Sequence, residues 1–266
     1  MPGVFNGMAA RLATAAGFDA LYVSGAGLSN AAGVPDVGLL SADEWVRQIG
    51  RICDATPLPV VADVDTGFGG PSNAAELLRD LERIGLAGLH VEDQLFPKRC
   101  GHLAGKALAP ADEMCIKLSA MCDAKADDDF LLIARTDARG VEGFEAAVER
   151  AGRYLEAGAD AIFPEAMADM SEFERFALAF PNVPLLANMT EFGKGPLLSV
   201  SDLGRIGYRM VIFPQSAFRV ANQAMLSAYR HLREAGTQAD LLDRMQTRQE
   251  LYDLLDYDPN QDVWRP

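Results

Sequence analysis

The sequence is poor in residues that mark several classes of protein. Its 266 residues include only four cysteines and three histidines. The cysteines form no CxxC pair and no regular framework, which argues against a disulfide scaffold. The histidines are scattered, which argues against a zinc site with three imidazole ligands. We therefore expect a reduced, cytoplasmic protein whose thiols are either packed or chemically used.

Basic charge and long apolar runs are also scarce. The net charge of −14 repels phosphate backbones and anionic membranes, so we expect no nucleic-acid partner. No apolar run approaches the roughly 20 residues of a membrane span, and no signal peptide is recognisable. An anionic substrate remains open, because a pocket's local charge can oppose the net charge. Such a pocket needs a metal ion or a few inward-facing arginines.

What the sequence does contain is a repeated pattern of strand, loop and helix. Four segments are near-copies of one another: AGFDALYVS, IGLAGLHVE, AGADAIFPE and IGYRMVIFP. In each, a predicted helix ends at a glycine in the C-cap region and a predicted strand follows. This alternation predicts βαβ units and a parallel sheet. The predicted strands are residues 20–24, 59–63, 88–92, 130–135, 161–165, 184–188 and 210–214, with 3–5 as the tail of an eighth. Predicted helices include residues 74–84, 110–124, 144–157, 170–180 and 200–206.

Eight such units predict a (β/α)₈ barrel of the TIM type, which forms a single domain at about 250 residues. A doubly wound open sheet is the alternative. We expect the barrel to span residues 1–219 and a helical tail to span 220–266, with helices at 217–234 and 238–255. The tail's apolar face, rich in Met and Leu, predicts packing on the barrel or on a neighbouring subunit.

Polar residues gather where the predicted strands end, which is where TIM barrels place their chemistry. Asp63, Asp65 and Glu92 form a set of hard oxygen ligands that suits Mg²⁺. Asp65 has an alternative reading as a helix cap before TGFGG. The other strand-end residues are Tyr22, Ser24, His90, Arg135, Asp137, Glu165, Asn188, Thr190, Ser216 and Arg219.

Two loops carry further candidates. Cys100 lies in segment 98–102, and its thiol, mostly protonated at neutral pH, can donate a proton to a carbanion. The other cysteines lie in helical patterns, and we interpret them as core or boundary residues. Residues 24–27 read SGAG but lack the third glycine of a dinucleotide fingerprint. We interpret them as a loop whose backbone N–H groups approach a carboxylate.

Motifs along nearly the whole chain resemble the isocitrate lyase/phosphoenolpyruvate mutase superfamily. In order they are YVSGAG, GVPDVG, DVDTGFG, HVEDQ, KRCGH, IARTDA, FPEA, LANMTEFG, FPQSAFR and MQTRQELYD. Within the superfamily, NMTEFG, Arg219 and the MQTR that ends at Arg248 look most like the methylisocitrate lyases. This resemblance implies a Mg²⁺-dependent carbon–carbon lyase, with Mn²⁺ as a substitute ion. Its tricarboxylate substrate, 2-methylisocitrate, would be cleaved to pyruvate and succinate by a retro-aldol step.

The resemblance also implies roles for individual residues. Asp63 and Asp65 would hold the metal directly or through water, with Asp36 and Glu92 near its waters. Cys100 would be the catalytic acid with support from His102, and segment 98–102 would be a gating loop. The family forms homotetramers in which C-terminal helices are exchanged between neighbours. The implied substrate-binding residues are Ser24, Gly25, Ala26, Gly101, Arg135, Glu165, Asn188, Thr190, Arg219 and Arg248.

Tyr22 is our candidate base for the substrate hydroxyl, although a phenol needs help from the metal or a cation.

The family usually has a helix and a full first strand before PGVFN, so either the true start lies upstream or the barrel lacks part of a strand. The methylisocitrate lyases often carry a glycine at the position of Ala26. The additional methyl group is tolerable only if the φ angle of this residue is negative. Alternative functions are a dimethylmalate lyase, an oxaloacetate-cleaving enzyme, a phosphonomutase, or a catalytically silent barrel kept for assembly or ligand binding.

Overall fold

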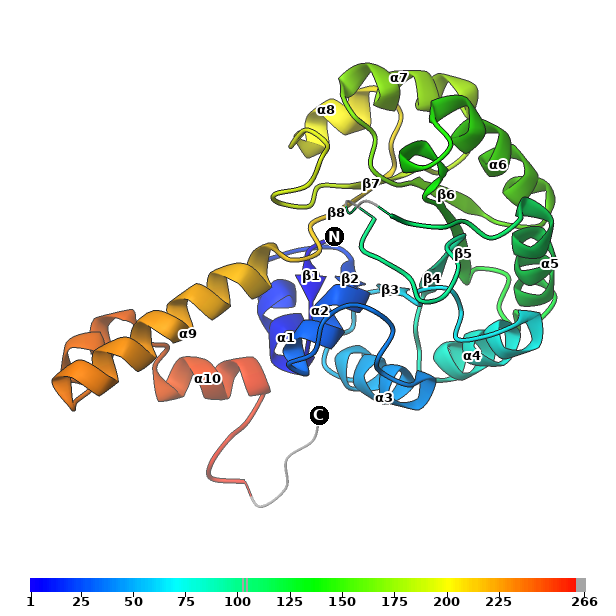
Figure 1. Ribbon diagram of the computed structural model, residues 1–266. Coiled ribbons are helices and arrows are strands. Elements are labelled where there is room, and N and C mark those ends of the chain that lie inside the picture. Colours follow the sequence, from blue (N-terminus) through cyan, green and yellow to red (C-terminus); the bar gives the residue numbers. More distant parts are fainter. Residues whose placement is uncertain (102, 104, 262–266) are drawn as a thin grey trace.

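The strands form a closed ring in the computed structural model, which describes residues 1–101, 103 and 105–261 (Figure 1). Parallel ladders join the first six strands in chain order and the last two strands to each other. Parallel bridges from Ile162 to Leu185 and from Pro2 to Phe213 connect these two groups. The ring excludes the open-sheet alternative. The strands are β1 (Gly3–Val4), β2 (Leu21–Val23), β3 (Val60–Asp63), β4 (Gly88–Glu92), β5 (Leu131–Thr136), β6 (Ala161–Pro164), β7 (Leu186–Asn188) and β8 (Met210–Ile212).

Helices surround this ring and follow the predicted alternation (Figure 1). The glycines of the four repeated phrases, Gly17, Gly85, Gly158 and Gly207, all have positive φ, as expected where a helix ends and turns toward a strand. The helices are α1 (Gly7–Ala15), α2 (Gly25–Ala31), α3 (Ala42–Cys53), α4 (Pro71–Arg83), α5 (Ala111–Cys122), α6 (Phe144–Glu156), α7 (Met170–Ala179), α8 (Val200–Arg205), α9 (Ser216–Ala235) and α10 (Arg248–Leu255), with short 3₁₀ helices η1 (Ala138–Gly140) and η2 (Ala239–Arg244).

The first strand is short but pairs on both sides. β1 lies in register with β2, and the Gly3 N–H donates to the Phe213 carbonyl over 2.9 Å. A Cβ on Gly3 would lie 2.1 Å from the carbonyl oxygen of Pro214, so only glycine fits this closing contact. The two ends of the barrel sequence therefore meet at this point.

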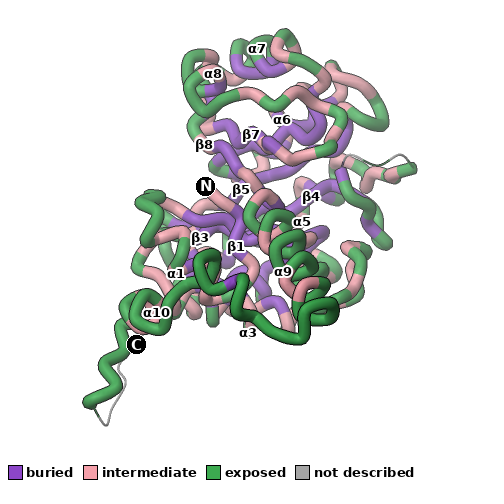
Figure 2. The backbone as a smooth tube through the Cα atoms, turned by 90° about the vertical axis from the view of Figure 1, so that its left-hand side faces the viewer, coloured by how far each residue is buried: buried purple, intermediate pink, exposed green. Residues whose placement is uncertain are grey.

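The core has two apolar layers that hold the strands in place. The larger layer lies between strands and helices, with Trp45, Ile49, Leu78 and Tyr154 among its fully buried members. A smaller cluster, which includes Phe163 on β6, joins residues from several strands. Figure 2 shows the strands buried while α10 is exposed. Within the described residues, no helix combines the length and the apolar character that a membrane crossing requires.

Helix α9 extends away from the barrel, and α10 turns back toward α1, where Arg11 donates to the Leu254 carbonyl over 3.0 Å (Figure 1). None of the 20 residues of α9, all of them described, is buried. The prediction of one helix over residues 238–255 is wrong, because η2 ends before Met245, whose backbone is extended. Thr247 then starts α10 with a capping box that Glu250 completes. The expected boundary between residues 219 and 220 falls inside α9.

Candidate active site

The strand ends surround a cavity of about 360 Å³ that collects most of the predicted site residues. Two other predicted residues, Gly25 and Asp65, contact its lining through Asp63 and Lys98. His102 lies outside the described residues. The predicted residues that line the cavity are Tyr22, Ser24, Ala26, Asp36, Asp63, Cys100, Gly101, Arg135, Glu165, Asn188, Thr190 and Arg219. The cysteine loop and the aspartates therefore face the same small space.

Asp63 is the last residue of β3 and Asp65 follows it, and both carboxylates lie near the start of α2. The Asp65 N–H donates to Asp63 Oδ1 over 2.9 Å, and the Gly25 N–H donates to Asp63 Oδ2 over 3.2 Å. A Cβ on Gly25 would lie 3.0 Å from an oxygen of each carboxylate. Asp65 itself has a φ of 49°, an uncommon value outside glycine. Backbone geometry thus brings two carboxylates together at one point.

The SGAG segment is a helix start, so its interpretation as a loop is wrong. Ser24 occupies the N-cap position, and α2 begins at Gly25. The unpaired N–H groups of a first helical turn favour a carboxylate, and Gly25 gives its N–H to Asp63. Ala26 lies inside α2 and is not among the described residues with positive φ, which meets the condition for an alanine there.

Lys98 belongs to the site through ion pairs that the sequence did not predict. Its Nζ lies 2.8 Å from Asp65 Oδ1 and also pairs with Asp36, and the side chain is 3% exposed. Burial opposes the charged amine, but Asp65, Glu92 and their neighbours outweigh it and raise the pKa of Lys98. The available signal was its place in the KRCGH motif, two residues before Cys100.

The carboxylates fit a hard divalent cation. Burial, with the charges of Asp63 and Asp36, raises the pKa of Asp65 to about 7. Burial also raises the pKa of Glu92, whose two oxygens have no hydrogen-bond partner among the described residues. No three His, Cys, Asp or Glu side chains converge on one metal position in the described chain. Mg²⁺ needs only one or two protein carboxylates because it keeps several waters, so Asp63 and Asp65 suit it.

Arg135, at the end of β5, is the second buried cation of the site. Its guanidinium donates to Asp137 over 3.0 and 3.3 Å. It also lies 3.1 Å from Glu92 and 3.5 Å from Glu165. These carboxylates outweigh the cost of burial and raise the pKa of Arg135. Asn188 from β7 donates to Glu165 over 3.2 Å, which ties three strand ends into one network.

The Cys100 loop packs directly on this network. A Cβ on Gly101 would lie 2.5 Å from Glu165 Cγ and 2.6 Å from Arg135 Nη2, so glycine permits the close approach. Lys106 donates to the Gly101 carbonyl over 2.5 Å and to Asp137 over 2.7 Å. Cys100 itself is exposed at the cavity wall. Lys106 was missed because it lies after the KRCGH motif and because Asp137, its carboxylate partner, lies after β5, far along the chain.

Tyr22, on β2, lines the same cavity and contacts His90. The Tyr22 hydroxyl and His90 Nε2 are 2.8 Å apart, and both side chains are buried. Burial and the charge of Asp63 raise the pKa of Tyr22, so the phenol is neutral. Burial lowers the pKa of His90 to about 4, so the imidazole is neutral too. The sequence placed His90 at a strand end but gave it no role.

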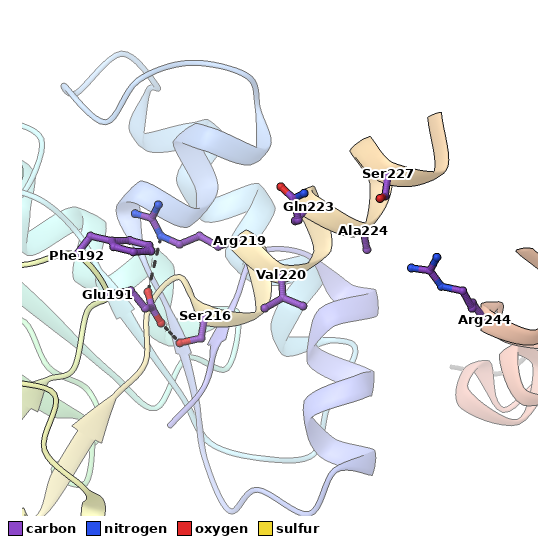
Figure 3. A pocket seen from close by; sticks show the side chains of 9 residues that line it. All are labelled: Glu191, Phe192, Ser216, Arg219, Val220, Gln223, Ala224, Ser227 and Arg244. Carbon is purple, nitrogen blue, oxygen red and sulfur yellow. Dashed lines mark hydrogen bonds and ion pairs between the residues drawn. The ribbon is translucent and has the colours of Figure 1, made fainter. Parts of the chain in front are cut away.

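The two arginines near the C-terminus lie in different places. Arg219, in the first turn of α9, lines the cavity. It also lines an apolar groove of about 660 Å³ along α9 (Figure 3). Arg248 starts α10, is exposed, and is not among the described residues that line the cavity. The structure of a single chain therefore does not bring Arg248 to the site.

Comparison with known proteins identifies the class. The family model described as phosphoenolpyruvate phosphomutase matches residues 1–233. A 2-methylisocitrate lyase of Aeropyrum pernix is 48% identical over 96% of this chain and 82% of its own length. That of Escherichia coli is 44% identical over 96% and 86%. A solved 2,3-dimethylmalate lyase has a TM-score of 0.91 and 37% identity over 95% and 85%. A phosphonopyruvate hydrolase solved with oxalate and Mg²⁺ has a TM-score of 0.86 and 30% identity over 95% and 88%.

The chain belongs to the phosphoenolpyruvate mutase/isocitrate lyase family, as its motifs predict. Within that family its curated relatives are lyases, and the chain is an enzyme of the carbon–carbon lyase class with a small-molecule substrate.

Proposed function

We propose that the enzyme cleaves 2-methylisocitrate into pyruvate and succinate in a Mg²⁺-dependent retro-aldol reaction. One observation carries this proposal: Cys100 shares a single cavity with the Asp63 carboxylate and with Arg135 and Arg219. An acid, a metal-ligand set and carboxylate-binding cations are the parts that cleavage of a hydroxy-tricarboxylate needs. The names of the curated relatives support the same substrate.

Asp63 and Asp65 would hold the metal, with Asp36 and Glu92 placed near its waters. The bound ion would supply Lewis-acid stabilisation of negative charge on substrate oxygen. Lys98 compensates part of the negative charge of these carboxylates, because its ammonium pairs with Asp65 and Asp36. At the start of α2, Ser24 and Ala26 would bind a substrate carboxylate through the Ser24 hydroxyl and the Ala26 N–H, and Gly25 between them would contribute its close backbone approach while its N–H is donated to Asp63.

Cys100 would donate a proton to the carbon of the departing succinate. A thiol is suited to this step because it can give its proton to a carbanion and remain as a thiolate. Lys106 holds the adjacent Gly101 carbonyl and so fixes the backbone beside the thiol. Segment 98–102 would exclude water while the carbanion is exposed, and His102 would support the acid.

Tyr22 would remove the substrate's hydroxyl proton. The phenol is neutral in the resting site, so it would act as a base only after losing that proton, which needs help from the metal or a cation. His90 Nε2, 2.8 Å from the hydroxyl, would hold the phenol in place through their hydrogen bond. Arg135, Asn188, Thr190 and Arg219 would bind the remaining carboxylates, and the two arginines place fixed positive charge where negative charge develops. Glu165 would take part in substrate binding by orienting Arg135 and Asn188, with which it interacts.

The tail would pack on a second copy of the chain, within a homotetramer. Its α9 has apolar side chains that the barrel does not cover, for example Val220 and Tyr229 at 70% and 65% exposed. A second copy is the natural cover, because such a face would otherwise stay in water. An exchanged tail would also explain how Arg248 reaches a substrate pocket, namely that of a neighbour.

A substrate panel tests the proposal, with pyruvate release followed by a coupled NADH assay. We expect Mg²⁺-dependent release from 2-methylisocitrate, its loss when EDTA removes the ion, and recovery when Mg²⁺ is restored. Asp65→Asn should raise the Mg²⁺ concentration needed for half-maximal rate. Metal-independent turnover, or none with 2-methylisocitrate, would contradict the proposal.

Dimethylmalate is the second candidate substrate. A solved 2,3-dimethylmalate lyase has the same fold at 37% identity, and Arg248 lies away from the cavity of its own chain. A site without that second arginine would suit a diacid better than a tricarboxylate. Faster cleavage of dimethylmalate than of 2-methylisocitrate in the panel would establish it.

A further inference from the structure

Arg219 is held by two consecutive residues of the loop after β7. Its Nε lies 3.7 Å from Glu191 Oε2, and its guanidinium carbon lies 5.5 Å from the centre of the Phe192 ring. Figure 3 shows the carboxylate and the ring beside the guanidinium, with Ser216 donating to the other Glu191 oxygen. We call Glu191 and Phe192 the arginine clamp.

The clamp has two features that a chance surface contact lacks. Glu191 Oε2 is shielded from water yet has no hydrogen-bond partner among the described residues, so the nearby guanidinium is what compensates its charge. Phe192 has a φ of 60°, a strained value for a bulky residue, and its side chain is 91% exposed. Strained backbone of this kind clusters at functional sites. Here it places an aromatic face beside the cation at cation–π distance.

Arg219 needs such support because its side chain adjoins two open spaces. It lines both the active-site cavity and the groove along α9, and its side chain is 51% exposed. A long arginine side chain has many rotamers in such a place. Glu191 contacts Nε and Phe192 contacts the guanidinium through its ring face, so neither contact uses the two terminal nitrogens. These two nitrogens can bind one carboxylate through two parallel hydrogen bonds.

We infer that Glu191 and Phe192 are positioning residues that aim Arg219 at the substrate carboxylate remote from the cleaved hydroxyl carbon. The inference rests on the proposed function and deepens it. It makes the clamp a determinant of affinity for the succinate half of the substrate, while proton transfer at Cys100 is left unaffected.

The test is a kinetic comparison on the full-length enzyme. Glu191→Gln keeps the side-chain size and the contact with Ser216 but removes the charge beside Arg219. We expect KM for 2-methylisocitrate to rise about tenfold, with kcat within about twofold, which is the pattern for loss of uniform binding. Phe192→Leu should raise KM by about threefold, a weaker effect, because only the ring contact is lost. Glu174→Gln, an exposed glutamate on α7, is the matched control and should change neither constant.

A double-mutant cycle separates positioning from general stability. If the clamp acts through Arg219, Glu191→Gln has no further effect on KM in an Arg219→Ala background. An unchanged KM in Glu191→Gln, or the same increase with and without Arg219, would overturn the inference. Phe192→Leu, alone and with Arg219→Ala, gives the same decision if Glu191→Gln does not fold.

Calorimetric binding of succinate gives a readout that does not depend on turnover. The Kd should weaken about tenfold in Glu191→Gln and stay constant in Glu174→Gln, a difference of about 1.4 kcal/mol. Equal Kd values in all variants, or no succinate binding by the wild type, would overturn the inference. Absence of 2-methylisocitrate cleavage by the wild type would overturn the proposed function alone, and the succinate Kd would then decide the clamp.

Discussion

Single residues set the charge balance of the site. Asp63, Asp65, Glu92 and Glu165 are each at most 5% exposed, and the carboxylates share their space with two buried cations, Lys98 and Arg135, at 3% and 7%. Like charges at close range cannot all stay ionised, so burial and repulsion push protons onto Asp65 and Glu92. The same imbalance makes the group a good ligand set, because a divalent cation relieves it.

Cys100 can be tested at this scale. We expect Cys100→Ser to fold and to bind Mg²⁺ as the wild type does, but to lower kcat by at least about 10²-fold, because a hydroxyl is a far weaker proton donor than a thiol. Initial rates of pyruvate release, thermal melting and Mg²⁺ calorimetry measure the three properties. Cys115→Ser, in a half-buried cysteine on α5, is the control and should keep full turnover. Turnover near the wild-type value in Cys100→Ser would remove the acid role.

Secondary-structure elements decide where these residues point. Asp93, directly after β4, accepts hydrogen bonds from Thr136 and Tyr154 over 2.8 Å each and from the Asp137 N–H. It thereby joins β4, the end of β5 and α6. Asp137 in turn holds Arg135 and Lys106, so this buried network carries the orientation of the site. Closure of the ring at β1 fixes the position of β8 in the same way. The helix that follows β8 is α9, which carries Arg219.

The closing contact predicts a strong effect of a small change. Gly3→Ala should destabilise the fold by about 1–3 kcal/mol, because its Cβ would overlap the Pro214 carbonyl, which is backbone and cannot rotate away. Gly152→Ala, in the middle of α6 with open space around it, should be neutral or stabilising by up to about 1 kcal/mol. Urea denaturation followed by circular dichroism measures both. Equal stability of the two variants would show that β1 does not close the barrel.

The whole molecule raises the question of how many chains build one site. Helix α9 leaves the barrel and exposes apolar side chains, and α10, which returns to α1, keeps Arg248 outside the cavity of its own chain. A single copy therefore leaves both an uncovered helix and a pocket without one expected arginine. The proposed exchange of tails between copies would answer both needs.

Complementation tests this exchange. We expect Cys100→Ser and Arg248→Ala to be impaired alone, the second mainly through a higher KM at low substrate. Mixed oligomers should regain activity, because a chain with Cys100 would receive Arg248 from its neighbour. Co-expression with two different affinity tags isolates the mixed species, and pyruvate release at low substrate measures it. Mixed oligomers no more active than the average of the two variants would show that each chain supplies its own Arg248.

The alternation of apolar strands and glycine-capped helices determined the barrel, because local periodicity and φ preference act within short segments. The residue types at strand ends, with the cysteine loop that follows one of them, likewise predicted that Asp63, Arg135 and Cys100 would lie around one cavity, since parallel strands finish at one rim. The sequence did not identify the pairing of Lys98 with Asp65, of Lys106 with Asp137 or of Glu191 with Arg219, nor the helix that starts at Gly25. Those depend on distances between segments far apart in the chain, and only the closed barrel sets such distances.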